Sequence, residues 1–444
     1  MPPKGIRHRF AMKNKNMNEM NSELTTIAQK NTTPDDDYSQ QSVQKSTKSL
    51  KRVRKSVGTF TSRENVPKRQ KPVTDPKIEL TITSSTTDDE DLDFGEEGLY
   101  PVKDGQLLKK RYKISKLLGV GGYATVHMAM NRKTKSDVAL KIVRCGEWYN
   151  EVSDREIQIM KTIKNASRAG SDSESPIGAS NVVSLLDNFR IKGEYGMHVV
   201  MVTEVLGPDL FSILVKSNQK VLSFDRIQRF SRNILNGLHF LHSNCGVMHL
   251  DLKPENIMVT VDHENMDLND PKCLATVKIG DFGLTCYTTK DVTRTVQSCC
   301  YRSPEAFLKA HITPAADIWS FGCTLYEMAT RELLFKCNDS ENCCRVFHMD
   351  NISNLLGPIK RSLFKKDKEN EWPLEQVFGE KKVLTGYPGS TNFICPEELR
   401  KRTLMNEHQA QACSDFLGKL MKIDPKKRLT AEQALKPSFF MERY

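Results

Sequence analysis

The fold is decided by one short stretch of sequence, His249-Leu250-Asp251-Leu252-Lys253-Pro254-Glu255-Asn256. In this stretch Asp251 can accept a proton from an attacking hydroxyl, and Lys253 can neutralise a phosphoryl group in transfer. Asn256 can hold a metal ion, and Asp281, which begins an Asp-Phe-Gly run, offers a second ligand. Hard oxygen ligands of this kind suit Mg²⁺ that bridges phosphates. The pattern therefore predicts phosphoryl transfer, with catalytic Asp251, Lys253 and Asn256 and a metal site at Asn256 and Asp281.

A glycine-rich turn lies upstream, within a segment over 112–126 that reads as strand, turn and strand. Backbone without Cβ atoms lets N–H groups approach phosphates closely. A strand follows the turn instead of a helix, which favours a phosphate-covering flap over a dinucleotide-binding turn. An ordinary hairpin turn is the alternative for this motif taken alone. The flap residues are Leu118, Gly119, Val120, Gly121, Gly122, Tyr123, Ala124, Thr125 and Val126.

A lysine ends the run Val138-Ala139-Leu140-Lys141 on the next predicted strand, over 137–143. There its ammonium can hold the α- and β-phosphates of a nucleotide. Glu156 follows 15 residues later, in a helix that the apolar spacing predicts over 152–163. A carboxylate at this place can pair with Lys141 and position it, although a Lys and a Glu can also pair on any surface.

The order of these motifs resembles the signature of the eukaryotic protein kinases. Two further runs extend the match, Ser303-Pro304-Glu305 and the run from Asp317 to Gly322, and the resemblance covers about residues 107–441. It implies an α+β fold of two lobes, a small β-rich N-lobe at about 107–203 and a large helical C-lobe at about 207–441, with ATP and Mg²⁺ in the cleft. The residues implied to bind ATP outside the flap are Ala139, Lys141, Glu156, Glu204 and Leu206.

The same resemblance implies structural roles. Thr203 stands at the gatekeeper position, and the hinge would be 204–206, whose backbone groups would bind adenine. Glu305 and Arg428 would form a buried pair. The residues that would stack as an apolar spine between the lobes are Met160, His249 and Phe282.

A finer resemblance is to the SR-protein kinases of the CMGC group. The residues that carry it are 204–207 with 215–218, 237–249, the Tyr-Arg-Ser-Pro-Glu run at 301–305, and Cys286, three residues after Gly283. Lys253 in the Asp-x-Lys-x-x-Asn run resembles serine/threonine rather than tyrosine kinases. The resemblance implies a serine/threonine kinase that transfers the ATP γ-phosphate to protein serines, in Arg/Ser-rich splicing-factor substrates.

The sequence also departs from that family. The family's long spacer inside the kinase domain is missing, and an extra loop is expected over about 262–273. Its acidic docking groove is poorly reproduced, because Glu332 and Glu341 are acidic whereas residues 343–348 are basic and apolar. A dual-specificity kinase, another CMGC kinase with a different substrate, and a pseudokinase scaffold therefore stay alternatives. The dual-specificity relatives carry activation-loop tyrosines where this chain has residues 293–295.

Many kinases carry Arg where Leu250 stands, and that buried cation needs a phosphate on the activation loop to compensate it. Leucine is neutral and can pack, so it creates no such need. The loop over 284–303 contains threonines that could be phosphorylated. We expect that their phosphorylation is not required for activity.

The charge is distributed unevenly along the 444 residues. Residues 1–71 hold 16 Lys and Arg against 6 Asp and Glu, residues 72–98 hold 1 against 9, and residues 99–444 hold 49 against 40. The first 98 residues are rich in Ser, Thr, Asn and Gln and lack sustained periodicity. They are expected to form a disordered arm before a kinase domain at 99–444.

Two basic clusters in this arm, at 51–55 and 68–71, resemble a bipartite nuclear-import signal. They predict that residues 51–71 bind an import receptor, and that the protein occurs in cytoplasm and nucleus. The alternative is a solvated basic tail that touches nucleic acid or acidic lipid without specificity. No motif for specific nucleic-acid recognition accompanies the clusters. We expect a monomer whose partners are its protein substrates.

The sequence offers no apolar run of the ~18 residues that a membrane helix needs, and its first thirty residues contain no apolar signal-peptide core. We therefore expect no membrane partner and a reducing compartment, in which the 12 cysteines are free thiols. The pairs Cys299-Cys300 and Cys343-Cys344 lack zinc-ligand spacing with partner His or Cys pairs. The 10 histidines show no metal cluster either.

Overall fold

The computed structural model describes residues 93–169, 175–216, 222–260, 268, 270, 273–292, 294–337, 345–364, 371–387, 392–436 and 438–440. The described residues fall in one compact unit. The arm up to residue 92 lies outside the described residues, and so do its basic clusters at 51–55 and 68–71. The Cys343-Cys344 pair, in the later loop, also lies outside them. No described helix combines the length and the apolar character needed to cross a membrane.

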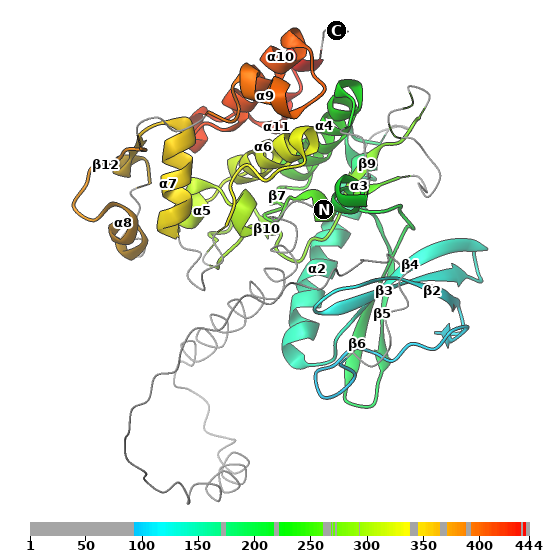
Figure 1. The fold of residues 1–444 in the computed structure, drawn as a ribbon. Helices are drawn as coiled ribbons and strands as arrows, with labels where there is room; N and C mark the ends of the chain where they lie inside the picture. The colour runs from blue at the N-terminus through cyan, green and yellow to red at the C-terminus, as the bar shows by residue number, and fades with distance from the viewer. Residues whose placement is uncertain are drawn as a thin grey trace, which may run out of the picture. The chain divides into compact units, whose positions relative to one another are not determined.

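The N-lobe is an antiparallel sheet of six strands in the order β1-β2-β3-β4-β6-β5 (Figure 1). Its strands are β1 (Leu107–Leu108), β2 (Tyr112–Val120), β3 (Ala124–Asn131), β4 (Ser136–Val143), β5 (Leu185–Lys192) and β6 (Met197–Thr203). Alternate residues of β4, such as Leu140 and Ile142, enter one apolar cluster, while Val143 enters another. This alternation follows from the two-residue period of a strand.

Helix α2 (Glu147–Ala166) packs against β4, β5 and β6. Its buried apolar residues Ile157, Met160 and Ile163 recur at helical spacing, as the sequence predicts. The same spacing also buries Glu156, which therefore faces the sheet rather than solvent. The helix extends beyond the predicted range at both ends.

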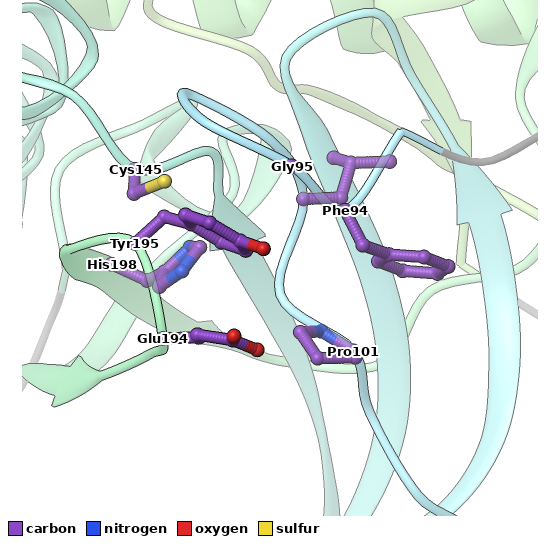
Figure 2. A pocket seen from close by; sticks show the side chains of 8 residues that line it. Phe94, Gly95, Pro101, Cys145, Glu194, Tyr195 and His198 are labelled. Atoms are coloured by element: carbon purple, nitrogen blue, oxygen red, sulfur yellow. The ribbon is translucent and has the colours of Figure 1, made fainter.

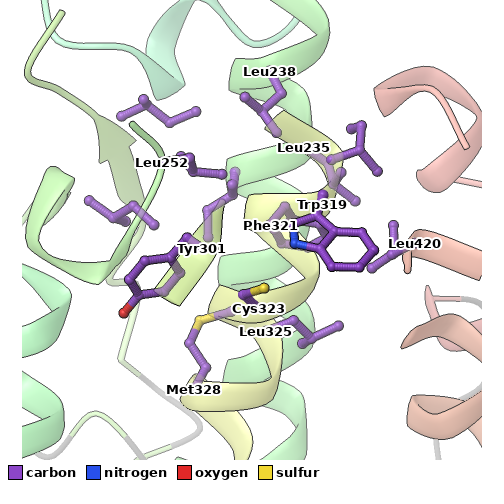
Figure 3. Packing of buried hydrophobic residues seen from close by; sticks show 14 of the residues in the cluster. Leu235, Leu238, Leu252, Tyr301, Trp319, Phe321, Cys323, Leu325, Met328 and Leu420 are labelled. Carbon is purple, nitrogen blue, oxygen red and sulfur yellow. The ribbon is translucent and has the colours of Figure 1, made fainter. Parts of the chain in front are cut away.

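The C-lobe is built mainly from helices around α6 (Ala315–Thr330), whose residues are all buried from Ala316 onward. Figure 3 shows α6 side chains, among them Trp319 and Phe321, packed between residues of other helices such as Leu235 and Leu420. Because α6 presents apolar side chains on every side, neighbouring helices have to enclose it. The other helices are α3 (Leu210–Lys216), α4 (Phe224–His239), α5 (Pro304–Phe307), α7 (Arg345–Leu356), α8 (Glu371–Phe378), α9 (Pro396–Arg402), α10 (Glu407–Leu420) and α11 (Ala431–Ala434).

Short strand pairs carry the active-site loops of the C-lobe. β7 (Val247–Met248) pairs with β10 (Cys286–Tyr287), and β8 (Ile257–Val259) pairs with β9 (Val277–Ile279). The predicted catalytic stretch lies between β7 and β8, and Asp281 follows β9. A further pair joins β11 (Ile359–Lys360) to β12 (Val383–Leu384). The two-lobed α+β fold predicted from the sequence is thus confirmed.

The sequence placed the start of the folded part near Leu99, and the structure corrects this boundary. Residues 93–98 pack on the N-lobe, because Arg144 makes an ion pair of 2.7 Å with Asp93 and donates to the carbonyl of Glu97 at 3.2 Å. The Cys145 N–H donates to the carbonyl of Gly98. Figure 2 shows the pocket of about 370 Å³ beside this segment, with Phe94 on one side and Tyr195 on the other. These contacts are long-range, so local composition did not reveal them.

The extra loop expected over 262–273 is anchored where the structure describes it. The buried guanidinium of Arg226, on α4, donates to the carbonyls of Leu268 at 2.6 Å, Cys273 at 3.0 Å and Ala275 at 3.2 Å. Burial lowers the pKa of Arg226, and the nearby Cys273 and Asp270 oppose part of that shift.

Candidate active site

The flap residues lie where the sequence placed them. Leu118 to Val120 end β2, the turn over 121–123 follows, and Ala124 to Val126 begin β3. The Gly121 N–H donates to the Ala124 carbonyl at 2.8 Å and closes the hairpin. Val126 pairs in register with Lys141 on β4, so the flap and the lysine belong to one sheet.

Lys141 and Glu156 form the pair that the sequence predicts. The ammonium lies 2.8 Å from Oε1 and 3.0 Å from Oε2 of Glu156, whose side chain is 3 % exposed. It also lies 3.4 Å from Oδ1 of Asp281. Burial alone would lower the pKa of Lys141, but the surrounding carboxylates outweigh it and raise that pKa well above its usual value. Lys141 is therefore held as a cation beneath the flap.

Tyr123, at the tip of the flap, contacts the predicted metal ligand. Its hydroxyl donates to Oδ1 of Asp281 at 3.2 Å, and the Lys141 ammonium lies 5.0 Å from the centre of its ring. Burial raises the pKa of Tyr123, so the hydroxyl keeps its proton and acts as a donor. The sequence placed Tyr123 in the flap but gave no indication of this contact.

The catalytic stretch gathers four polar side chains. Lys253 lies 2.8 Å from Oδ2 of Asp251, and Asn256 donates from Nδ2 to the Asp251 carbonyl at 2.8 Å and to Oδ2 at 3.1 Å. Ser298 belongs to the loop over 284–303, called the activation segment below. Its hydroxyl donates to Oδ1 of Asp251 at 2.8 Å, and its N–H donates to the same oxygen at 3.1 Å. Lys253 also donates to the Ser298 hydroxyl at 2.7 Å. Ser298 is thus part of the catalytic site, although no sequence motif indicated this role.

The carboxylate of Asp317, on α6, fixes the backbone of the catalytic stretch. Its carboxylate accepts the N–H groups of His249 and Leu250, each at 2.8 Å, and a hydrogen bond from His242 at 2.8 Å. Burial opposes its ionisation, but these donors prevail and keep the pKa of Asp317 below its ordinary value. Leu250 has φ of 60°, a strained region for a non-glycine residue, so the anchored carboxylate fixes a backbone shape that the chain would otherwise avoid.

The apolar residues beneath the site are buried. The ring of His249 lies 5.6 Å from that of Phe282 in an edge-to-face arrangement, and Met160 of α2 belongs to the same buried cluster as Phe282. The backbone of Phe282 lies close enough to the Glu156 carboxylate to favour its charged form. The segment that carries Asp281 is therefore joined both to α2 and to the catalytic stretch.

The hinge region follows β6. Ala139 on β4 pairs in register with Thr203, the predicted gatekeeper. Glu204 binds Lys278 of β9 through its side chain at 2.7 Å, so this side chain ties the hinge to the C-lobe. Leu206 is half-buried and packs against the large apolar cluster.

A hard divalent cation fits the donor set at Asn256 and Asp281. Asn256 uses its amide nitrogen to bind Asp251, which fixes the amide so that the carbonyl oxygen is the atom it can offer a cation. Asp281 adds carboxylate oxygens beside it in the cleft, and its φ of 61° turns it out of the regular strand that precedes it. Oxygen ligands in small number, next to a phosphate site, match the preference of Mg²⁺.

The activation segment is held by hydrogen bonds from both its side chains and its backbone. Arg294 donates to the carbonyl of Leu284 at 2.9 Å, and the Gln297 N–H donates to the carbonyl of Leu250 at 2.8 Å. The Tyr287 hydroxyl pairs with that of Thr162 on α2 at 3.0 Å.

The cysteine pairs lack zinc-ligand spacing in the sequence and Cys299 is a free thiol, but the fold brings Cys299 close to a second cysteine and a histidine. Its Sγ lies 3.1 Å from Nε2 of His348, and Sγ of Cys337 lies 3.2 Å from the same nitrogen. The three ligand atoms lie within 4.8 Å of one another. The three residues come from separate segments, so no sequence motif with short, regular spacing predicts that they meet.

Glu305 and Arg428 form the buried pair implied by the resemblance. The guanidinium binds the carboxylate through two bonds of 2.7 and 3.1 Å, and both side chains are almost fully buried. The pair ties the segment after the activation loop to the C-terminal part of the lobe.

The comparisons with known proteins agree with this geometry. The family described as "Protein kinase domain" matches residues 112–440. The chain is 29 % identical to "Serine/threonine-protein kinase SRPK" of Physarum polycephalum, over 79 % of this chain and 90 % of that protein. It is 24 % identical to "Protein kinase dsk1" of Schizosaccharomyces pombe, over 85 % of this chain and 89 % of that protein. It is also 28 % identical to "Dual specificity protein kinase lkh1" of S. pombe, over 81 % of this chain but only 50 % of that protein.

The family match spans most of the chain, and it contains every described residue of the cleft between Leu118 and Asp281. The relatives named above are kinases over nearly the same length of this chain. The chain therefore belongs to the protein kinase family, as an SRPK-like serine/threonine kinase.

Proposed function

We propose that this kinase transfers the γ-phosphate of ATP to serine hydroxyls through the residues of the cleft. The observation that carries the proposal is the three-way contact among Asp251, Lys253 and Ser298. A carboxylate, an ammonium and a hydroxyl in mutual contact form a site that can orient a substrate hydroxyl and accept its proton. A pseudokinase would need a defect in this set, and each predicted member of it is present.

Each residue has a distinct part in the proposed step. Asp251, oriented by Asn256 and Ser298, accepts the proton of the attacking hydroxyl. Lys253, next to it, offsets the negative charge of the phosphoryl group as it is transferred. Lys141, held by Glu156, positions the nucleotide phosphates. Mg²⁺ bound at Asn256 and Asp281 would neutralise phosphate charge.

The metal assignment has a direct test. Asp281→Ala should remove Mg²⁺-dependent nucleotide binding, measured as the change in affinity for ATP with and without Mg²⁺. Asp225→Asn, at an exposed position in the first turn of α4, is the control and should bind as the wild type does. Equal Mg²⁺ dependence in wild type and Asp281→Ala would remove Asp281 from the site.

We further propose that the substrate serines lie in Arg/Ser-containing sequence. This rests on the finer sequence resemblance and on the SRPK-type relatives. A groove of about 580 Å³ lies between the end of α6 and α7. It does not favour binding of a substrate arginine, because Glu332 in its wall already forms an ion pair of 2.9 Å with Arg402. Recognition of arginine would therefore rely on groups outside this groove.

The decisive experiment is an arrayed peptide library phosphorylated by the full-length chain. Arg/Ser repeats, the same peptides with Thr or Tyr in place of Ser, and peptides with acidic flanks should be compared, with Asp251→Asn as the background control. We expect serine in Arg/Ser context to give the highest rate. Preference for acidic flanks, with Arg/Ser repeats ignored, would overturn the substrate assignment.

A dual-specificity kinase is the second candidate, because lkh1 is among the relatives. The Tyr287 hydroxyl is paired with Thr162, which does not favour its use as a phosphorylation site. The tyrosine peptides of the same array separate the two candidates. Phosphotyrosine on them, or on the chain itself by mass spectrometry, would favour the second.

We propose that the protein shuttles between cytoplasm and nucleus through the basic clusters at 51–55 and 68–71. The test is the distribution of a fluorescent fusion of the full chain in cells. Alanine at the basic residues of both clusters should shift it to the cytoplasm. Alanine at Lys13 and Lys15, in the same arm, is the matched control, and a shift of equal size there would refute a specific signal.

A further inference from the structure

We propose that Cys299, Cys337 and His348 bind Zn²⁺ at a site that joins the activation segment to α7. The three ligand atoms, two sulfurs and one imidazole nitrogen, lie within 4.8 Å of one another. Thiolate and imidazole are the ligands that zinc prefers in proteins, and they exclude the hard cation of the nucleotide site. The proposal does not depend on which protein substrate the kinase uses.

The distances fit a metal at the centre of the group. With Zn–S of about 2.3 Å and Zn–N of about 2.0 Å, tetrahedral ligands lie about 3.5–3.8 Å apart. Nε2 of His348 lies 3.1 Å from one sulfur and 3.2 Å from the other. The ligands therefore need to separate by only a few tenths of an ångström to enclose the ion.

A hydrogen-bonded arrangement explains this geometry less well. Two thiols lie near a single ring nitrogen, Nε2, which has either one lone pair or one proton to share. Two thiolates around a bound cation can both direct their charge at the same centre. The Sγ of Cys300 lies 3.5 Å from that of Cys337, so a third sulfur, which would be a fourth ligand atom, lies at the edge of the group.

The site would hold together segments that form one wall of the active site. Cys299 directly follows Ser298, whose hydroxyl binds Asp251. Cys337 lies beyond the end of α6, and His348 is buried on α7, where it stacks on Phe307 of α5 at 4.9 Å. Helices α5 and α7 lie side by side (Figure 1). Zinc would thus fix the position of Ser298 from the side remote from the nucleotide.

The first test is the metal content of the full-length wild-type chain, purified under reducing conditions without chelators or immobilised metal. Elemental analysis should find about one zinc per chain. Cys337→Ser and His348→Ala should lose it. Cys395→Ser, a cysteine of similar partial burial that starts α9 outside the group, should keep it. Circular dichroism checks that the variants are folded.

A second measurement on the wild type covers the case in which the variants do not fold. Zinc should leave on treatment with a thiol reagent and chelator, and added Co²⁺ should give the thiolate-to-cobalt absorption of a sulfur-ligated site. Where Cys337→Ser folds without zinc, its peptide KM should exceed that of the wild type while its ATP KM stays unchanged. This split distinguishes a site that positions Ser298 from a general loss of stability.

Three results would overturn the proposal. One is wild-type chain free of zinc that also gives no sulfur–cobalt absorption. Another is zinc retained at the wild-type level in folded Cys337→Ser. The third is a disulfide that joins Cys337 to Cys299 or Cys300 in protein kept under reducing conditions, because an oxidised pair cannot ligate the metal.

Discussion

The hydroxyl of Tyr123 donates a hydrogen bond of 3.2 Å to Oδ1 of Asp281, which joins the tip of the flap to the proposed metal ligand. The same carboxylate oxygen lies 3.4 Å from the Lys141 ammonium. Tyr123 therefore contacts the carboxylate that we propose binds the cation when the nucleotide binds. In that proposal the contact would link the position of the flap to the metal site.

Tyr123→Phe should raise the affinity for Mg²⁺–ATP, because it removes a donor that competes with the cation for Asp281. A hydrogen bond to a charged group is worth about 1.5–3 kcal/mol when buried, and part of it is replaced by water in an open cleft, so we expect a gain of up to about tenfold. Titration calorimetry with a non-hydrolysable ATP analogue measures it. Tyr100→Phe, which alters a hydroxyl that accepts from Gln106 on the N-lobe, is the control. Weaker binding by Tyr123→Phe would mean that the hydroxyl assists the metal site.

Asp251→Asn should keep ATP binding and lose phosphoryl transfer. The amide cannot accept the hydroxyl proton, and a general base contributes about 10²–10⁴-fold to the rate. Single-turnover transfer to a peptide and equilibrium binding of ATP separate the two effects, with Asp225→Asn as the control. Wild-type turnover by Asp251→Asn would show that another group receives the proton.

Arg428→Met should destabilise the C-lobe strongly. It would leave Glu305 buried without its cation, and loss of one partner of a buried pair costs about 3–5 kcal/mol. Urea unfolding followed by tryptophan fluorescence is a suitable measurement, since Trp319 lies 5.1 Å from the Arg428 guanidinium. Lys436→Met breaks an exposed pair with Glu432 and should leave the midpoint unchanged. Equal midpoints for the two variants would contradict this account.

Removal of phosphate from the activation segment should leave the initial rate nearly unchanged. Arg294 and Gln297 already hold the segment through backbone carbonyls, and Leu250 presents no cation that needs a phosphate. The measurement is the rate of phosphatase-treated protein whose unmodified segment is confirmed by mass. A drop of about a hundredfold, equivalent to about 2.8 kcal/mol, would instead identify the segment as a switch.

The two-lobed fold and the kinase activity can be predicted from the amino-acid sequence alone. The run 249–256, Asp281 and the pair of Lys141 and Glu156 are recognisable because each motif is contiguous, or keeps a spacing that one strand or helix imposes. Lys141 and Glu156 meet as expected because Glu156 falls on the buried face of α2, in the same helical period as Ile157 and Met160.

Contacts between segments that keep no fixed spacing in the sequence are visible only in the folded structure. The hydrogen bond from Tyr123 to Asp281 joins residues 158 positions apart, and the bond from Ser298 to Asp251 joins residues 47 positions apart. The packing of residues 93–98 joins residues as many as 51 positions apart. Cys299, Cys337 and His348 are likewise brought together by α6 and α7 rather than by a local motif. Loops of any length can close such contacts at similar entropic cost, so sequence separation carries little information about them, whereas the packing of the helices fixes which side chains meet.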